Sequence, residues 1–296
     1  MTFILRSVLE SYLQQRISQF INSNMRLKND EMLGKKRALI EKRHVDVVKC
    51  KAKGTICNVV DNDDDTQTVE YSVMYQFLIK QKKKIYVEEQ QEQRVATFEN
   101  GELISDACPV LEGTDKWDAL EMLEVRNKLD EPNKSAVSGY NRNEAVKYAE
   151  RWWNDYNPNY HHFTNDCTNY ISQCLRAGGN TMRGYPTRTQ GWWYRGSNWS
   201  FSWSVAHALT LYLASSTRGL RAKEVKSPKE LLVGDIICYD FEGDGRFNHT
   251  TIVVAKDEDG MPLVNAHTQN SRMRYWSYED STAYTPNIKY RFYSIL

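Results

Sequence analysis

Residues 164–179 read TNDCTNYISQCLRAGG, and this stretch decides how the second half of the chain is interpreted. The opening Thr, Asn and Asp are common helix N-caps, so we expect a helix to begin at Asp166. Apolar residues then recur at helical spacing until Gly178 and Gly179, which are typical of a helix end. The pattern predicts a helix that carries Cys167 in its first turn.

A cysteine in the first turn of a helix lies beside unpaired backbone amides and the positive end of the helix dipole. Both features favour a thiolate, which is the form that attacks an amide carbonyl. The same amides can hold the oxyanion that follows. We interpret Cys167 as a candidate nucleophile, with a buried apolar cysteine as the alternative. The other cysteines fall in predicted strands or on an inward helix face and are interpreted as core residues: Cys50, Cys57, Cys108, Cys174 and Cys238.

The elements around this helix predict an α+β domain. Asn141 and Glu144 fit a capping box at the start of an upstream helix, and a third helix is expected over residues 204–215. The later part is rich in β-forming residues. Helices followed by strands favour helices packed on an antiparallel sheet. The expected strands cover residues 234–240, 249–256, 262–268 and 289–295.

The first half differs in composition and predicts a second α+β unit, in which helices pack on an antiparallel sheet. Of the 35 Phe, Trp and Tyr residues, only nine precede residue 140. A polar stretch with one possible helix, residues 116–128, separates the halves. We therefore predict an accessory domain with its linker over residues 1–135 and a second domain over 136–296. The expected elements of the first domain are helices over 5–21 and 35–44 and strands over 46–60, 68–78, 85–97 and 103–110.

His249 begins a predicted strand just after a glycine-containing loop, where a histidine is well placed to act as a base. If the following hairpin turns near residue 258, His267 lies opposite His249. Asn265 has the same parity and shares that face. Either residue could orient the imidazole, which leaves Cys–His–His and Cys–His–Asn sites open, and we favour His267.

Further residues are predicted to contact substrate. We expect this of Asp166 and His162, although His161 and His162 could equally be exposed loop residues. Four tryptophans also lie in a segment with little periodicity. They predict an aromatic substrate groove, with buried core and lid anchors as alternatives. They are Trp192, Trp193, Trp199 and Trp203.

We expect no metal and no cofactor. Residues 240–245 resemble the opening of a calcium loop, but Thr251 stands where such a loop needs a bidentate Glu. A tight turn that carries His249 into place is the preferred interpretation. Zinc bound by Cys167, His249 and His267 would have a suitable ligand count. It would not explain the N-cap residues before the cysteine.

Composition argues against several classes of protein. Lys and Arg total 39 against 38 Asp and Glu, so no basic excess indicates nucleic-acid binding. No apolar run reaches the roughly 18 residues of a membrane span. Arg6, Glu10 and Arg16 interrupt what would be the apolar centre of a signal peptide. We therefore expect a cytoplasmic protein, or a cell-wall protein if another export route serves it.

Several short motifs together resemble the bacterial putative amidase domain family over about residues 140–296. They read FTNDCTNYISQ from Phe163, GDI from Gly234, NHT from Asn248 and NAHT from Asn265. That family is grouped with papain-like cysteine hydrolases and is related to CHAP and other cell-wall peptidase domains. The resemblance implies a papain-like fold, Cys167 as nucleophile, His249 as base, and His267 or Asn265 as the third polar residue.

The resemblance also implies a reaction. A cysteine amidase or peptidase of this group would cleave an amide bond of peptidoglycan, or of a related peptide, through an acyl-enzyme on Cys167. The alternative is a binding module of the same fold. Such a module would hold cell-wall fragments or a partner protein without turning them over.

Overall fold

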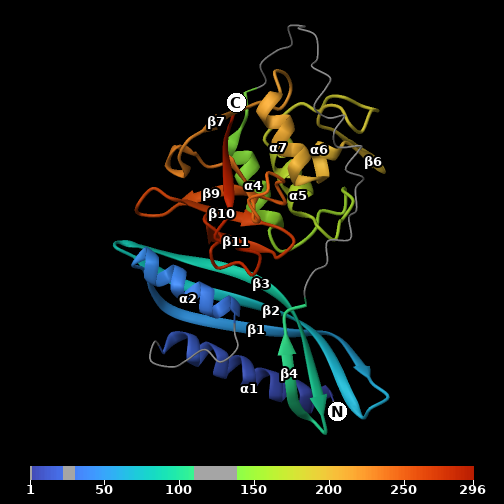
Figure 1. The fold of residues 1–296 in the computed structure, drawn as a ribbon, viewed down its shortest axis with the longest axis vertical. Coiled ribbons are helices and arrows are strands. Elements are labelled where there is room, and N and C mark those ends of the chain that lie inside the picture. The colour runs from blue at the N-terminus through green and yellow to red at the C-terminus, as the bar shows by residue number, and fades with distance from the viewer. Residues whose placement is uncertain (1, 23–30, 110–138) are drawn as a thin grey trace. The chain divides into compact units, whose positions relative to one another are not determined.

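The computed structural model describes residues 2–22, 31–109 and 139–296, and the chain forms two compact units (Figure 1). The first unit contains Met1–Glu112 together with two later segments, Gln269–Ser271 and Tyr278–Thr282. The second contains the remaining residues from Gly113 onward. Both units combine helices with antiparallel strands, which confirms the mixed α and β composition. The expected boundary at 135/136 and the expected helix over 116–128 lie outside the described residues, so the domain limits remain a prediction.

Long strands dominate the first unit, in the order β1-β2-β3 with β4 paired to β3. From Val69 onward the odd-numbered residues of β2 are buried and the even-numbered ones are more exposed, as expected of a sheet covered on one face. The four-residue spacing of Leu5, Leu9, Leu13 and Ile17 indicates the buried face of the first helix, and all four side chains are buried. The elements are α1 (Thr2–Ile21), α2 (Glu31–Arg43), β1 (Asp46–Asp61), β2 (Thr66–Gln81), β3 (Lys84–Glu99) and β4 (Glu102–Ala107).

A buried charge cluster ties a late segment of the chain into the first unit. The Lys36 ammonium is fully buried, pairs with the Glu88 carboxylate, and lies 3.0 Å from the Asp280 carboxylate. The Gln90 side chain donates a 2.8 Å hydrogen bond to the same Asp280 oxygen. Removing one member of such a buried set typically costs several kcal/mol, because the remaining charges lose their partners.

The second unit packs helices against a sheet with strand order β11-β10-β9-β8-β12-β7. The helix expected over 204–215 corresponds to α7, and extended backbone at Val205 separates it from the short helix α6, which was not predicted. Four short strands, β5, β6, β7 and β11, were not predicted either. The elements are α4 (Arg142–Trp152), α5 (Cys167–Ala177), β5 (Tyr194–Arg195), β6 (Asn198–Trp199), α6 (Phe201–Ser204), α7 (Ala206–Ser215), β7 (Ala222–Val225), a 3-10 turn (Pro228–Glu230), β8 (Ile236–Asp240), β9 (His249–Lys256), β10 (Pro262–Ala266), β11 (Ser271–Tyr275) and β12 (Lys289–Ile295).

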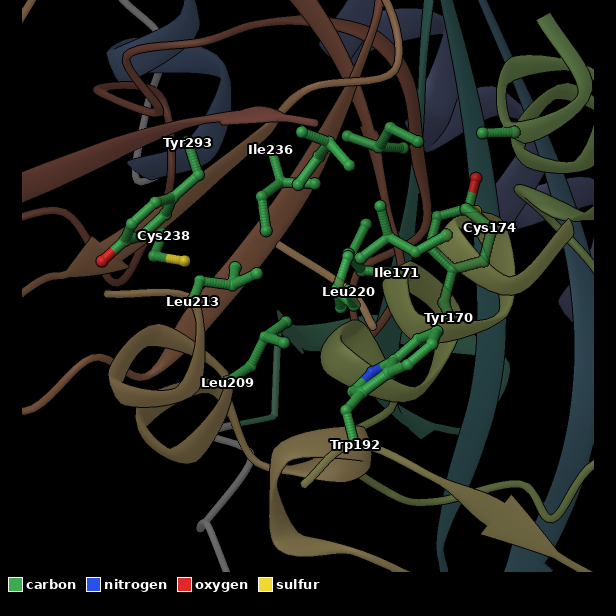
Figure 2. Close-up of a cluster of buried hydrophobic side chains, with 14 of the residues drawn as sticks. Tyr170, Ile171, Cys174, Trp192, Leu209, Leu213, Leu220, Ile236, Cys238 and Tyr293 are labelled. Atoms are coloured by element: carbon green, nitrogen blue, oxygen red, sulfur yellow. The ribbon is translucent and has the colours of Figure 1, made fainter. Parts of the chain in front are cut away.

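One face of this sheet forms the main hydrophobic core with α5 and α7 (Figure 2). Ile236 and Cys238 of β8 and Ile252 of β9 point into it. Cys174 and Cys238 have no exposed surface and are core residues as predicted. The same prediction is wrong for Cys57, which is exposed, and for Cys108, which is only half-buried. Among the described helices, none combines the length and apolar character needed to cross a membrane.

Candidate active site

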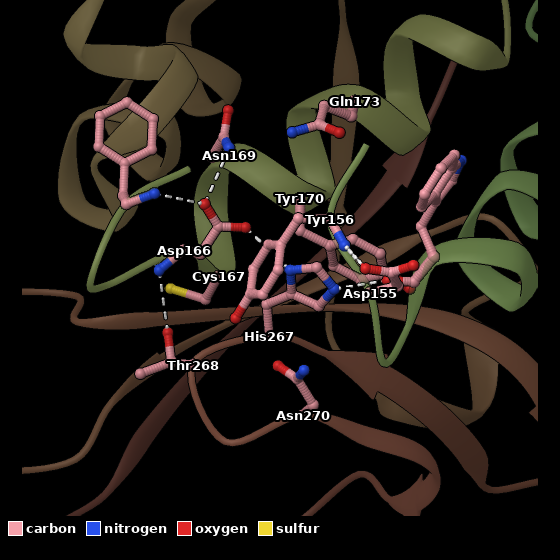
Figure 3. Close-up of polar contacts among 12 residues, drawn as sticks. Asp155, Tyr156, Asp166, Cys167, Asn169, Tyr170, Gln173, His267, Thr268 and Asn270 are labelled. Carbon is pink, nitrogen blue, oxygen red and sulfur yellow. Dashed lines mark hydrogen bonds and ion pairs between the residues drawn. The ribbon is translucent and has the colours of Figure 1, made fainter. Parts of the chain in front are cut away.

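Asp166 immediately precedes α5 and is almost completely buried (Figure 3). Its side chain does not cap the helix, contrary to our expectation. Instead, Oδ1 accepts hydrogen bonds from the Phe163 backbone N–H (3.0 Å) and the Asn169 side-chain amide (2.9 Å). This burial also corrects the predicted contact between Asp166 and substrate.

His267 is the histidine that the structure brings to this carboxylate. Its Nδ1 lies 2.8 Å from Asp166 Oδ2, and its Nε2 lies 2.7 Å from the backbone carbonyl oxygen of Trp152. A carbonyl only accepts, so Nε2 carries a hydrogen. The contact between Nδ1 and Oδ2 also requires a proton. Because Asp166 Oδ1 already accepts two hydrogen bonds, we assign this proton to the ring, which gives an imidazolium–carboxylate pair.

A backbone tie holds the histidine segment against the start of α5. The Asp166 N–H donates a 3.1 Å hydrogen bond to Thr268 Oγ1. Thr268 adopts a positive φ of 83°, which is unusual for a β-branched residue. The Tyr170 ring stacks on His267 with centroids 3.9 Å apart. His267 is therefore fixed from three sides, next to the residue that precedes Cys167.

Cys167 lies in the first turn of α5, as predicted, and is about 5% exposed. Burial raises the pKa of the Cys167 thiol. Hydrogen bonds from the Thr168 hydroxyl and from the Thr250 backbone and hydroxyl oppose that rise. The prediction that Cys167 rests as a thiolate is therefore wrong, and its side chain is a thiol at neutral pH. The same hydrogen bonds would stabilise the thiolate once it forms.

His249 does not face Cys167. It pairs with Tyr239 across β8 and β9, and Cys238 pairs with Thr250. Because Cys238 and Thr250 point toward α5, the His249 side chain lies on the opposite face of the sheet. Its ring lies near the rings of Tyr239 and Phe241, with centroids 5.5 and 6.0 Å away.

The hairpin register explains why this prediction is wrong. Asn265 pairs with Ile252, and an irregularity between Leu263 and Val264 shifts the pairing of β9 with β10 by one residue. A shift of one residue transfers every later side chain to the other face. His249 and Asn265 therefore lie on opposite faces, and His267 is not the cross-strand partner of His249.

Burial, with a smaller effect of the Arg274 charge, lowers the pKa of His249 to about 3. The ring is therefore neutral across the physiological range. In the unfolded chain the same group titrates at its ordinary value of 6.5. Below pH 6.5 the unfolded chain binds a proton that the folded chain does not bind. Stability is therefore lost as the pH falls from 6.5 toward 3.

We predict that His249→Phe will remove this pH dependence while keeping an aromatic ring beside Tyr239 and Phe241. Between pH 6.5 and 4.5 the parent should lose about 2 kcal/mol more unfolding free energy than the variant, since each pH unit contributes up to about 1.4 kcal/mol. Urea denaturation of both proteins at the two pH values measures the difference. Equal losses in parent and variant would show that His249 titrates normally in the folded protein.

Asn265 is fully buried and serves a structural contact. Its side-chain amide donates a 2.9 Å hydrogen bond to Glu150, and its oxygen accepts one from the Met273 backbone N–H.

His162 is exposed, and its ring lies 3.8 Å from the ring of Tyr156. Tyr156 in turn meets His267 edge-on at 5.0 Å. The structure therefore places His162 near His267, whereas the hydrogen bonds of Asn265 are structural.

The predicted aromatic groove is wrong for three of its four tryptophans. Trp192, Trp193 and Trp203 have essentially no exposed surface. The rings of Trp192 and Trp203 belong to the core beside α5, and the Trp193 indole donates to the Thr187 and Gln190 carbonyl oxygens. Trp199 is half-buried. It stacks on His161 at 5.1 Å and meets Phe163 edge-on at 4.9 Å, both in the segment that leads to Cys167.

The loop that follows β8 is a tight turn. The buried Asp240 carboxylate accepts hydrogen bonds from the backbone amides of Gly243 (2.7 Å), Asp244 (3.2 Å) and Gly245 (2.8 Å). The Asp240 side chain therefore closes the turn on itself by binding its backbone amides. This geometry supports the turn interpretation of residues 240–245.

Sequence reasoning missed Asn169 and Trp203 as members of this polar network. Asn169 lies one helical turn after Asp166, and that i, i+3 spacing was a usable signal. Trp203 is 34 residues away from Asn169, and its contact depends on tertiary packing.

Comparisons with known proteins add one family and two relatives. A family model described as a putative amidase domain matches residues 139–293. The protein named "Uncharacterized protein YhbB" of Bacillus subtilis (strain 168) is 48% identical over 304 residues, covering 99% of this chain and 96% of that protein. "Uncharacterized protein YjcM" of the same organism is 29% identical over 145 residues, covering 46% of this chain and 32% of that protein. No solved structure matches the chain.

Proposed function

The chain belongs to the putative amidase domain family, and on that premise we propose that it hydrolyses amide bonds with Cys167 as the nucleophile. One observation carries the proposal: the Asp166–His267 ion pair is held next to the helix start that bears this cysteine. We assign His267 as the catalytic histidine in place of His249, because His249 faces the other side of the sheet.

The proposed reaction starts when the Cys167 thiol loses its proton to solvent, which leaves a thiolate near the His267 imidazolium. The sulfur attacks the amide carbonyl carbon, and the carbonyl electron pair moves to oxygen. Backbone amides at the start of α5 are available to stabilise that oxyanion. For the next step, the Nε2–H of the imidazolium must leave the Trp152 carbonyl oxygen and reach the leaving nitrogen. It then gives its proton to that nitrogen, the C–N bond breaks, and an acyl thioester remains.

The second half of the reaction restores the enzyme. Water attacks the thioester carbonyl while the now neutral His267 ring takes a proton from it. The C–S bond breaks, the acid product leaves, and the thiolate and imidazolium are regenerated. Asp166 stabilises the charged ring throughout, as an orienting carboxylate does in other nucleophilic hydrolases.

We further propose a papain-like arrangement and a peptidoglycan stem peptide as substrate. A cysteine at the N-terminus of a helix packed on an antiparallel sheet supports the first proposal. The second rests on the resemblance to cell-wall peptidase domains. The partly exposed rings of Trp199, His161 and Phe163 offer a surface on which a sugar or peptide could pack.

Digestion of purified peptidoglycan with the full chain tests this proposal. We expect soluble fragments that have each gained one water and carry a new free amine, and mass spectrometry identifies the bond. Protein alkylated at Cys167 serves as the control and should release none. Tight binding of peptidoglycan without new amine ends would contradict hydrolysis and favour a binding module.

A further inference from the structure

A line of buried hydrogen bonds runs from Trp203 to the site histidine. The Trp203 indole N–H donates to Asn169 Oδ1 at 2.8 Å, and Asn169 Nδ2 donates to Asp166 Oδ1 at 2.9 Å. Asp166 Oδ2 then faces His267 Nδ1 at 2.8 Å. All four residues are at most 2% exposed. The charge on the histidine is thus connected to a tryptophan in the core of the second unit.

The direction of these bonds is set by chemistry. An indole nitrogen can only donate, so the Asn169 atom facing Trp203 must be the amide oxygen. The Asn169 nitrogen is then turned toward two acceptors, Asp166 Oδ1 and the His161 carbonyl oxygen, the latter also at 2.9 Å. Both amide hydrogens are used, and the amide has one orientation that satisfies every partner.

We infer that Trp203 and Asn169 are positioning residues for the proposed hydrolysis: they keep Asp166 ionised and facing His267. This inference rests on the proposed function. Without the indole N–H, the buried Asn169 Oδ1 loses its hydrogen bond from Trp203, and the amide can shift toward another donor and away from Asp166. A carboxylate that loses a hydrogen-bond donor is less stable in its charged form, so Asp166 becomes a weaker partner for the imidazolium.

The other titratable groups around the pair do not replace Asp166. Burial raises the pKa of Tyr170, whose ring covers the imidazole, and that of Tyr148, so both stay neutral. Glu150 is paired with Arg272 at 2.7 Å. The remaining neighbours are the Tyr156 phenol and the Cys167 thiol.

The chain offers a matched pair of substitutions. Trp192 is as fully buried as Trp203, and the two rings lie 4.9 Å apart in the same core. The Trp192 indole donates instead to Ser172 Oγ at 3.0 Å, away from Asp166. Trp203→Phe and Trp192→Phe each remove one indole donor and part of one ring. Their effects on thermal stability should be similar.

We expect the two variants to differ in the site. Trp203→Phe should lower kcat by roughly tenfold to a hundredfold with little change in KM, because the histidine loses its fixed geometry and charge partner. Trp192→Phe should stay within about threefold of the parent, since it leaves that partner in place. The pH profile of kcat should shift only for Trp203→Phe.

The positioning role of Trp203 and Asn169 can also be tested without measuring turnover, so that this test does not depend on the proposed hydrolysis. NMR of the nitrogen-15-labelled His267 side chain follows the hydrogen bond between Nδ1–H and Asp166. At one fixed pH, the Nδ1–H signal should weaken in Trp203→Phe relative to the parent and to Trp192→Phe. Asn169→Leu, which removes the two amide donors at similar size and adds no charge, should give the same change if Trp203→Phe does not fold.

Identical His267 Nδ1–H signals in the parent, in both tryptophan variants and in Asn169→Leu would overturn the positioning role. If Trp203→Phe shows the expected weaker signal and the parent hydrolyses no peptidoglycan, the positioning role stands and the proposed substrate or reaction fails.

Discussion

Replacing Cys167 with alanine should abolish amide hydrolysis, with a loss on the order of 10^4-fold or more. The sulfur forms the acyl intermediate, and no other group near the start of α5 is proposed to take that role. The fold should survive, because the side chain is small and lies at the end of the helix. Release of new amine ends from peptidoglycan, measured for equal amounts of folded protein, gives the effect.

Cys174→Ala is the matched control for this experiment. Cys174 lies on the same helix but is fully buried in the core. Its loss should lower stability by roughly 1 kcal/mol through the cavity that it leaves, with turnover nearly unchanged. A folded Cys167→Ala protein that retains substantial activity would show that the nucleophile lies elsewhere.

His267→Gln should lower kcat by roughly a hundredfold to ten-thousandfold, the range expected when a catalytic histidine or its orienting partner is lost. Glutamine retains an N–H donor for the Asp166 carboxylate, so the buried charge keeps a partner and folding is preserved. It cannot give a proton to the leaving amine. The acyl-enzyme should therefore form very slowly, which single-turnover measurements would detect.

Asn265→Ala on β10 provides the comparison. Asn265 bonds Glu150 and the Met273 backbone, so its loss should cost about 1–3 kcal/mol of stability. Its effect on kcat should be within a few-fold. If His267→Gln turns over normally while His249→Phe is inactive, the catalytic role belongs to the histidine on the other face of the sheet.

Local patterns predicted most of the fold. The four-residue spacing from Leu5 to Ile17 and the long β-rich runs gave α1 and β1 to β3 nearly at their observed limits. The strands β5, β6, β7 and β11 were missed because two to five residues carry little periodic signal. The pairing of Lys36 with Asp280 has no local signature, because the two residues are 244 positions apart.

The site was predicted less completely, for two physical reasons. The position of Cys167 follows from local helix signals and was correct. Whether Asn265 and His267 share a face with His249 depends on one irregularity at Leu263/Val264, and alternation alone cannot locate such a shift. Trp192 and Trp203 were predicted to line a substrate groove because they lie in a segment without helical spacing. Their burial arises from packing between segments far apart in sequence.

The buried cluster of Lys36, Glu88 and Asp280 has a consequence for biosynthesis. Lys36 and Glu88 are 52 positions apart and leave the ribosome early, whereas Asp280 follows Lys36 by 244 residues. At about 5–20 residues per second, that interval lasts roughly 10–50 s. During this time the first unit lacks the carboxylate that completes its buried charges. The part of the chain that is translated first is therefore among the last to reach its final structure.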